Sequence, residues 1–163
     1  MKSRTKTTTV AATQSPEKQL AGFIARFDPA LAKLVRSARK VLREKFFPTA
    51  VELVYDNYNA LAIGFATTEK ASGAIVSLAV YPRWVNLYFV YGASLPDPEG
   101  LLQGTGNRGR FIRLDDLKRF DQPAVQQLLR AAIDDADPPL PAKGRGYTLI
   151  KMALEKRRPR RLA

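Results

Sequence analysis

A change in the spacing of apolar residues at Pro48 divides this chain into two kinds of predicted secondary structure. Before Pro48, apolar side chains recur every three or four residues, which predicts helix over most of 17–46. Ser15-Pro16 and Asp28-Pro29 each place a capping residue before a proline, which is typical of a helix start. Pro48 ends the helical pattern, and β-branched and aromatic runs follow it.

The second half of the pattern predicts strands and one further helix. Short turns separate β-prone runs at 51–55, 61–65, 74–80, 85–90 and 111–114, so we expect an antiparallel meander. Asp121 is then expected to cap a helix that ends near three aspartates and three prolines. The fold class is therefore α+β. The repeating apolar faces predict these core residues: Phe23, Leu34, Val41, Leu53, Ile63, Val76, Leu87, Phe89, Leu128 and Ile133.

Length and charge favour one domain with basic ends. The chain has 163 residues and a net charge of +12, of which residues 1–20 carry +3, 21–137 carry +2 and 138–163 carry +7. We therefore predict a disordered leader at 1–16, a domain at 17–137, and a basic C-terminal extension at 138–163 with a possible edge strand at 147–152. The cluster Lys156–Arg161 has no apparent means of packing.

Two absent residue types exclude several kinds of site. The chain contains no cysteine and no histidine, which excludes disulfides, thiolate metal sites and a Ser-His-Asp triad. No apolar run reaches the roughly 18 residues that span a bilayer, and no secretory signal is recognisable, so we expect a cytoplasmic protein without a membrane partner.

The segment Gly104-Thr-Gly-Asn-Arg-Gly109 has the G-x-G-x-x-G spacing of a dinucleotide-binding loop. A strand follows it where such a loop needs a helix, and no acid lies near Leu128, so the nucleotide interpretation fails. Two alternatives remain: a tight turn, or a loop whose backbone N–H groups bind an anion with help from nearby arginines and aromatics. The ligand-binding candidates are Tyr55, Trp84, Gly104, Gly106, Arg108, Arg110 and Arg113. A pocket joining Tyr55, Trp84 and Arg110 would favour ligand binding, and its absence an interaction role.

Several segments resemble the YdhG-like domain family, a domain of unknown function that includes bacterial frataxin-like iron-chaperone candidates. The resemblance covers roughly residues 17–161. It is carried by Leu20–Ile24, Glu52–Tyr55, Asn86–Pro98, Leu101–Gly106, Arg110–Arg113 and the ending 157–161. The chain departs from the family's pattern at Asp56-Asn-Tyr-Asn59, at Asn107-Arg108 and at Phe111. The resemblance implies N-terminal helices packed on a curved antiparallel β-sheet, followed by a C-terminal helix and a basic tail.

These observations leave three functional hypotheses. The first is a non-enzymatic small-ligand or interaction domain of the YdhG-like type, whose partner is a small anion or a protein. The second, implied by the resemblance, is a frataxin-like iron chaperone; the acids available are Asp115 with Asp116, Asp97 with Glu99, and Asp134, Asp135 and Asp137, which are otherwise surface acids and helix caps.

The third hypothesis is weak, salt-sensitive and non-specific nucleic-acid contact through Lys156, Arg157, Arg158, Arg160 and Arg161. We expect no cofactor and no metal site, with Asp115 and Asp116 the remaining metal candidates. No nucleophile–base pair is apparent, so a non-enzymatic role is favoured over catalysis without excluding it. The sequence leaves the oligomeric state open.

Overall fold

The N-terminal half of the domain is helical, as the spacing predicts. The computed structural model describes residues 14–161, and positions 1–13 of the predicted leader lie outside the described residues. Helix α2 (Pro16–Ala25) is capped by Ser15, whose hydroxyl accepts the N–H of Lys18 at 3.1 Å. Helix α3 (Pro29–Val41) runs into a π-helical turn, Leu42–Phe46, directly before Pro48. In the described part of the chain, no helix is both long and apolar enough to cross a membrane.

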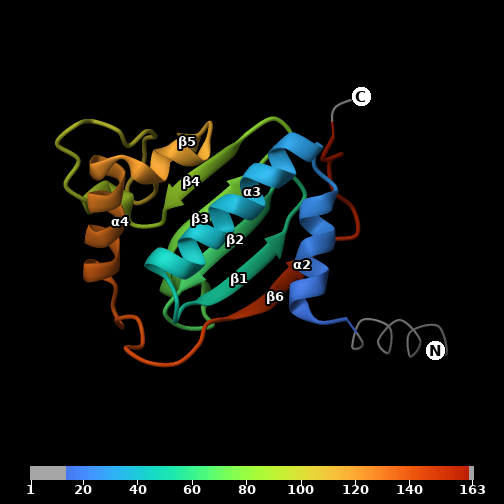
Figure 1. Ribbon diagram of the computed structural model, residues 1–163, viewed down its shortest axis with the longest axis horizontal. Helices are drawn as coiled ribbons and strands as arrows, with labels where there is room; N and C mark the ends of the chain where they lie inside the picture. The colour runs from blue at the N-terminus through green and yellow to red at the C-terminus, as the bar shows by residue number, and fades with distance from the viewer. Residues whose placement is uncertain (1–13, 162–163) are drawn as a thin grey trace.

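All the predicted strands are present in one open six-stranded sheet of order β5-β4-β3-β2-β1-β6 (Figure 1). The strands are β1 (Val51–Asp56), β2 (Leu61–Ala66), β3 (Ala74–Val80), β4 (Val85–Phe89), β5 (Arg110–Leu114) and β6 (Tyr147–Ala153). Strands β1 to β5 form the expected antiparallel meander, and edge strand β6 joins it parallel to β1, so the sheet is mixed. The N–H of Gly146 donates to the carbonyl of Pro48 at 3.0 Å, so both strands start side by side and run in the same direction.

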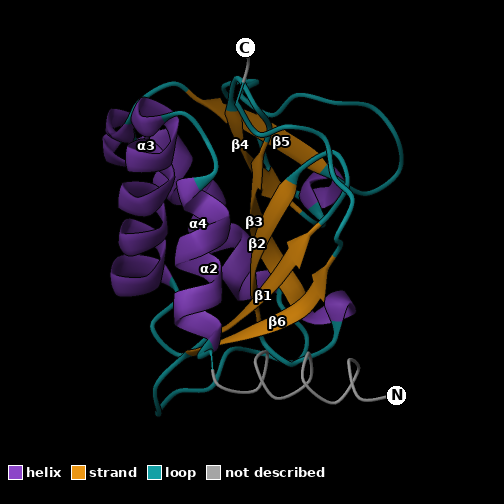
Figure 2. Cartoon of the chain, turned by 90° about the vertical axis from the view of Figure 1, so that its right-hand side faces the viewer, coloured by secondary structure: helices purple, strands orange, loops and turns teal. Residues whose placement is uncertain are grey.

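Within residues 14–161, helices α2, α3 and α4 (Pro123–Asp135) cover one face of the sheet, and the other face carries no helix of comparable length (Figure 2). Helix α2 packs near β6, whereas α3 and α4 both contact β3. Asp121 does not cap α4: the cap position is Gln122, and Asp121 ends a 3-10 turn, Leu117–Asp121. Pro123 explains the shift, because proline suits the first helical position, where no N–H is needed.

The hydrophobic core lies between the sheet and the helices. Seven of the predicted core residues are buried there or on the opposite sheet face: Phe23, Leu53, Ile63, Val76, Leu87, Phe89 and Leu128. Leu34, Val41 and Ile133 are half-buried and pack against the core's margin. Helix α3 instead turns Ala32, Val35 and Ala38 inward. The small alanine side chains let the helix lie close to the sheet, which moves the larger neighbours to its flanks.

Leu87 offers a test of this packing. Its side chain is fully buried at the centre of β4. We expect Leu87→Ala to lower the free energy of unfolding by about 2–5 kcal/mol, because it removes buried methyl groups and leaves a cavity. Urea titration followed by circular dichroism measures the change. A loss below about 1 kcal/mol would mean that the site collapses or that Leu87 is not buried.

Candidate functional site

The glycine-rich loop precedes β5 and folds back along it. Gly104 and Gly106 have φ angles of +114° and +98°, a region that side chains with a Cβ rarely adopt. Gln103 and Phe111 exchange two backbone hydrogen bonds, of 2.8 and 3.0 Å, which close the base of the loop. Within residues 14–161, no backbone N–H from Thr105 to Gly109 donates to a protein acceptor. The loop is thus a tight turn with exposed amide groups, and anion binding there stays a prediction.

The three arginines proposed for that loop point to different places. The guanidinium of Arg110 donates to the carbonyls of Gly106 and Gly109 at 3.1 and 2.7 Å, so it stabilises the loop from within. Arg108 lies over the ring of Tyr91, 5.6 Å from its centroid. Arg113 lies 4.8 Å from the centroid of Trp84. The structure therefore does not bring these arginines together around one ligand position.

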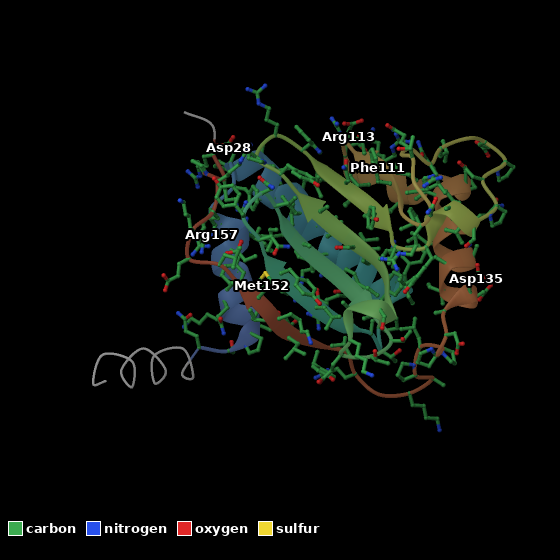
Figure 3. All side chains as sticks on the ribbon, turned by 180° about the vertical axis from the view of Figure 1, so that it is seen from behind. Asp28, Phe111, Arg113, Asp135, Met152 and Arg157 are labelled. Atoms are coloured by element: carbon green, nitrogen blue, oxygen red, sulfur yellow. The ribbon has the colours of Figure 1, made fainter. Side chains whose placement is uncertain are left out.

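The predicted aromatic candidates lie on the sheet face away from the helices. Trp84 stacks on Tyr81 with ring centroids 5.2 Å apart, and Tyr55 packs with a small cluster around Leu53 on β1. Figure 3 views this face and shows Phe111 and Arg113 near each other at one edge. A hollow of about 370 Å³ elsewhere in the described residues contains none of the seven predicted ligand-binding residues. Neither this hollow nor the one beside Phe46 and Phe120 joins Tyr55, Trp84 and Arg110, the combination that would have favoured ligand binding at those residues.

That hollow, which we call the α4 pocket, lies between the β2–β3 connection, the end of β4 and the C-terminal end of α4. Its volume is about 370 Å³, within the usual range for small-molecule sites. The apolar lining consists of Ala74, Ile75, Phe89, Leu95, Ala132 and Ala136. The polar lining consists of Thr67, Ser72, Tyr91, Ser94, Asp135 and Asp137. Such a combination of apolar surface and a few polar groups is typical of a ligand site.

Most hydroxyl groups of the α4 pocket donate their hydrogens to the protein itself. Tyr91 donates to the carbonyl of Ser72 at 2.7 Å, and Ser94 donates to the carbonyl of Tyr91 at 3.1 Å. Thr67 makes a longer contact, of 3.5 Å, to the carbonyl of Gly73. Since a hydroxyl has one hydrogen and two lone pairs, these groups present oxygen acceptors to the cavity.

Two buried carboxylates on β1 form polar sites that the sequence analysis missed. Residues alternate between the faces of a strand, so Glu52 and Asp56 lie on the same face as Val54, toward the helices. Both carboxylates are only about 1% exposed. Two acids on one face of a largely apolar strand were the signal that could have revealed these sites. Their arginine partners, however, lie on other elements of the fold.

The first of these sites, the Glu52 cluster, ties α2, α3 and β6 to β1. The guanidinium of Arg39 donates two hydrogen bonds to the carboxylate of Glu52, of 2.6 and 2.7 Å, and one to Glu17 at 2.8 Å. The hydroxyl of Thr148 contacts both carboxylates, and Arg43 lies 3.3 Å from Glu17 and 3.4 Å from Glu52. Two arginines thus balance two glutamates.

The contacts of the Glu52 cluster shift the pKa values of Arg39 and Glu17. Burial by itself lowers the pKa of Arg39, but the hydrogen bonds and charge of Glu52 and Glu17 raise it well above its ordinary value. For Glu17, burial raises the pKa, whereas hydrogen bonds from Thr148 and Arg39 and the charges of Arg39 and Arg43 lower it overall. Both groups are therefore held in their charged forms.

The second site, the Asp56 cluster, anchors the C-terminal tail. Arg160 is 4% exposed and donates to Asp56 at 2.9 Å, and Arg26 donates to the same carboxylate at 3.1 Å. The Nε of Arg157 lies 3.0 Å from Asp56, near enough for an ion pair but without the alignment of a hydrogen bond. The expectation that Lys156–Arg161 does not pack is therefore wrong, because a buried carboxylate 104 residues earlier holds Arg160.

Arg161 has a different attachment. Its guanidinium donates to the carbonyls of Ala25, Arg26 and Phe27 at 3.1–3.2 Å, at the C-terminal end of α2. Helix C-termini carry partial negative charge and unpaired carbonyls, so a cation there is favourable. Of the five nucleic-acid candidates, only Lys156 and Arg158 are exposed without such an internal acceptor among the described residues. Nucleic-acid contact by the tail stays a prediction.

The predicted metal candidates are exposed acids. Asp116 accepts the N–H of Lys118 at 2.7 Å and caps the 3-10 turn, and Asp115 precedes it on the surface. Between residues 14 and 161, no three or more His, Cys, Asp or Glu side chains gather closely enough to hold a metal ion.

Comparison with known proteins gives no family for this chain. No family model, no curated protein and no solved structure matches it.

Arg160 and Arg158 form a matched pair for testing the Asp56 cluster. We expect Arg160→Ala to lower the free energy of unfolding by about 3 kcal/mol, near the lower end for breaking a buried ion pair, because Arg26 and Arg157 remain. Arg158 is exposed over Tyr58, so Arg158→Ala should cost less than about 1 kcal/mol. Urea unfolding of both variants makes the comparison. Equal losses would contradict the anchoring role.

Glu17 gives a pH-dependent test of the Glu52 cluster. Its pKa is lowered from 4.5 in the folded protein. Its stabilising effect is therefore complete above the unfolded-state value and is lost as the pH falls through the lower folded value. We expect wild type to exceed Glu17→Gln in melting temperature at neutral pH, and the gap to close as the pH falls below 4.5. A gap that stays constant with pH would contradict this assignment.

Proposed function

We propose that this chain is a non-enzymatic small-ligand-binding domain and that its ligand occupies the α4 pocket. The observation that carries the proposal is the pocket itself, which has a volume of about 370 Å³ and both apolar and polar side chains in its lining. Three separate parts of the fold supply that lining, namely the β2–β3 connection, β4 with the turn after it, and the end of α4. Sites for small molecules commonly occur at such junctions.

The polar clusters of the described residues support a binding role over catalysis. Thr148 with Glu52 is the buried hydroxyl–carboxylate pair of the Glu52 cluster. Arg39 holds that carboxylate with two charge-assisted hydrogen bonds, and Glu52 is almost fully buried. A carboxylate so neutralised is a poor base, and its burial separates it from a substrate. The cluster is therefore better explained by its structural role.

The proposal keeps the domain within the YdhG-like type suggested by the sequence segments quoted above. The iron-chaperone alternative gains no support from the arrangement of the described acids. For the nucleic-acid alternative, the burial of Arg160 and the internal hydrogen bonds of Arg161 reduce the charge available at the tail. Ligand binding is favoured over these two alternatives because the α4 pocket offers a cavity for the ligand.

A fragment screen on the labelled protein tests the proposal. We expect some members of a library containing neutral, acidic and basic fragments to shift the amide signals of Ser72, Ser94 and Ala132 in proton–nitrogen NMR spectra. Ala136→Leu fills part of the pocket and should weaken those hits at least about tenfold. Ala153→Leu makes the same change at an exposed position on β6 and should leave binding intact.

The location of the hits decides the outcome. Fragments that map to the Gly104–Gly109 loop instead would place the site where the sequence analysis expected it. A library without any hit at the α4 pocket would contradict the proposed function.

A further inference from the structure

We infer that the α4 pocket selects small organic cations, such as a primary ammonium or guanidinium group on an apolar body. The inference rests on the proposed function, since it names the chemical class of ligand for the same cavity. Two independent observations carry it: the pocket's hydrogen-bonding groups are mostly acceptors, and two of its lining residues are aspartates that form no ion pair with a described residue.

The α4 pocket offers more hydrogen-bond acceptors than free donors. The hydroxyls of Tyr91, Ser94 and Thr67 donate to backbone carbonyls and leave their oxygens as acceptors. Backbone N–H groups of the lining are also used: those of Thr67, Gly73, Ser94, Leu95 and Ala136 all donate to carbonyls within the protein. A ligand that brings N–H donors matches these acceptors, whereas an anion would find few free donors.

The negative charge of the pocket lining also favours a cationic ligand. Asp135 ends α4 and Asp137 follows two residues later; both line the pocket, and neither forms an ion pair with a described residue. The last turn of α4 contains no basic residue, so its unpaired carbonyls add negative potential at the same place. An ammonium group bound there compensates two carboxylates and the helix end together.

Opposing charges limit the affinity but do not reverse the preference. Arg108 lies over the ring of Tyr91, which also lines the pocket, and the chain as a whole carries +12. Exposed charges are screened over about 8 Å at physiological ionic strength. The lining itself contains two carboxylates and no lysine or arginine, so the charges in direct contact with the cavity are negative.

Three ligands with one ring and different head groups test the inference: benzylamine, benzyl alcohol and sodium benzoate. Each is titrated into the labelled full-length protein at neutral pH, and the shifts of Ser72, Ser94 and Ala132 give a dissociation constant. We expect benzylamine to bind at least about tenfold more tightly than benzoate, with benzyl alcohol between them, because hydrogen bonds to charged groups exceed neutral ones by this much. The affinity of the pocket for benzylamine should fall as salt is added.

Asp134 provides a matched control, since it precedes Asp135 on α4 but does not line the pocket. Asp135→Asn and Asp137→Asn should each weaken benzylamine by about threefold to tenfold and leave benzyl alcohol nearly unchanged. Asp134→Asn removes the same charge from the same helix end and should change benzylamine binding by less than about twofold. Each variant keeps the size of the side chain it replaces.

Each result supports or overturns the inference. Equal losses from Asp134→Asn and Asp135→Asn would show that only the general field matters and would overturn it. Benzyl alcohol or benzoate binding in the pocket as tightly as benzylamine would also overturn it, while leaving the proposed ligand-binding function in place. If none of the three ligands and no library fragment shifts the pocket signals, both the inference and the proposed function fail.

Discussion

The rest of this structure depends on two carboxylates buried on the helix-facing side of β1. An ionised carboxylate in an apolar interior costs several kcal/mol unless it is paired and hydrogen-bonded. Glu52 therefore requires Arg39 of α3, and Asp56 requires Arg26 beyond α2 together with Arg160 of the tail. These pairs determine where both N-terminal helices and the C-terminus lie on the sheet. The apolar core contains most of the buried side chains. The two carboxylates add specific ion pairs between β1 and Arg26, Arg39 and Arg160.

The same ion pairs show that part of the tail's positive charge is used inside the fold. In the sequence, residues 138–163 look like a solvated basic extension, with a net charge of +7. In the fold, Arg157 and Arg160 approach Asp56, and Arg161 caps the carbonyl end of α2. Deleting the tail to test nucleic-acid binding would therefore also remove two partners of a buried carboxylate. Substituting the exposed Lys156 and Arg158 separates the two effects.

The carboxylates of the α4 pocket lie apart from the anchored arginines of the C-terminal tail. Figure 3 shows Arg157 at one end of the sheet and Asp135, on α4, at the other. Asp135 and Asp137 line the α4 pocket, whereas Trp84 and Arg113 do not. Two of the chain's carboxylates, Asp135 and Asp137, line this cavity, and their position motivates the proposed preference for cationic ligands.

The sequence by itself determined the elements of this protein, because helix and strand periodicity is a local property. The helix starts at Ser15-Pro16 and Asp28-Pro29, the change at Pro48 and the strand at Tyr147–Ala153 were all visible in short windows. Only the tertiary structure decided the parallel pairing of β6, the partners of Asp56 and the lining of the α4 pocket. Arg160 and Asp56 are 104 residues apart, and Thr148 and Glu17 are 131 apart, so no local pattern joins them. Such contacts form because burying a carboxylate is unfavourable without an arginine, and the folded chain alone determines which arginine is within reach.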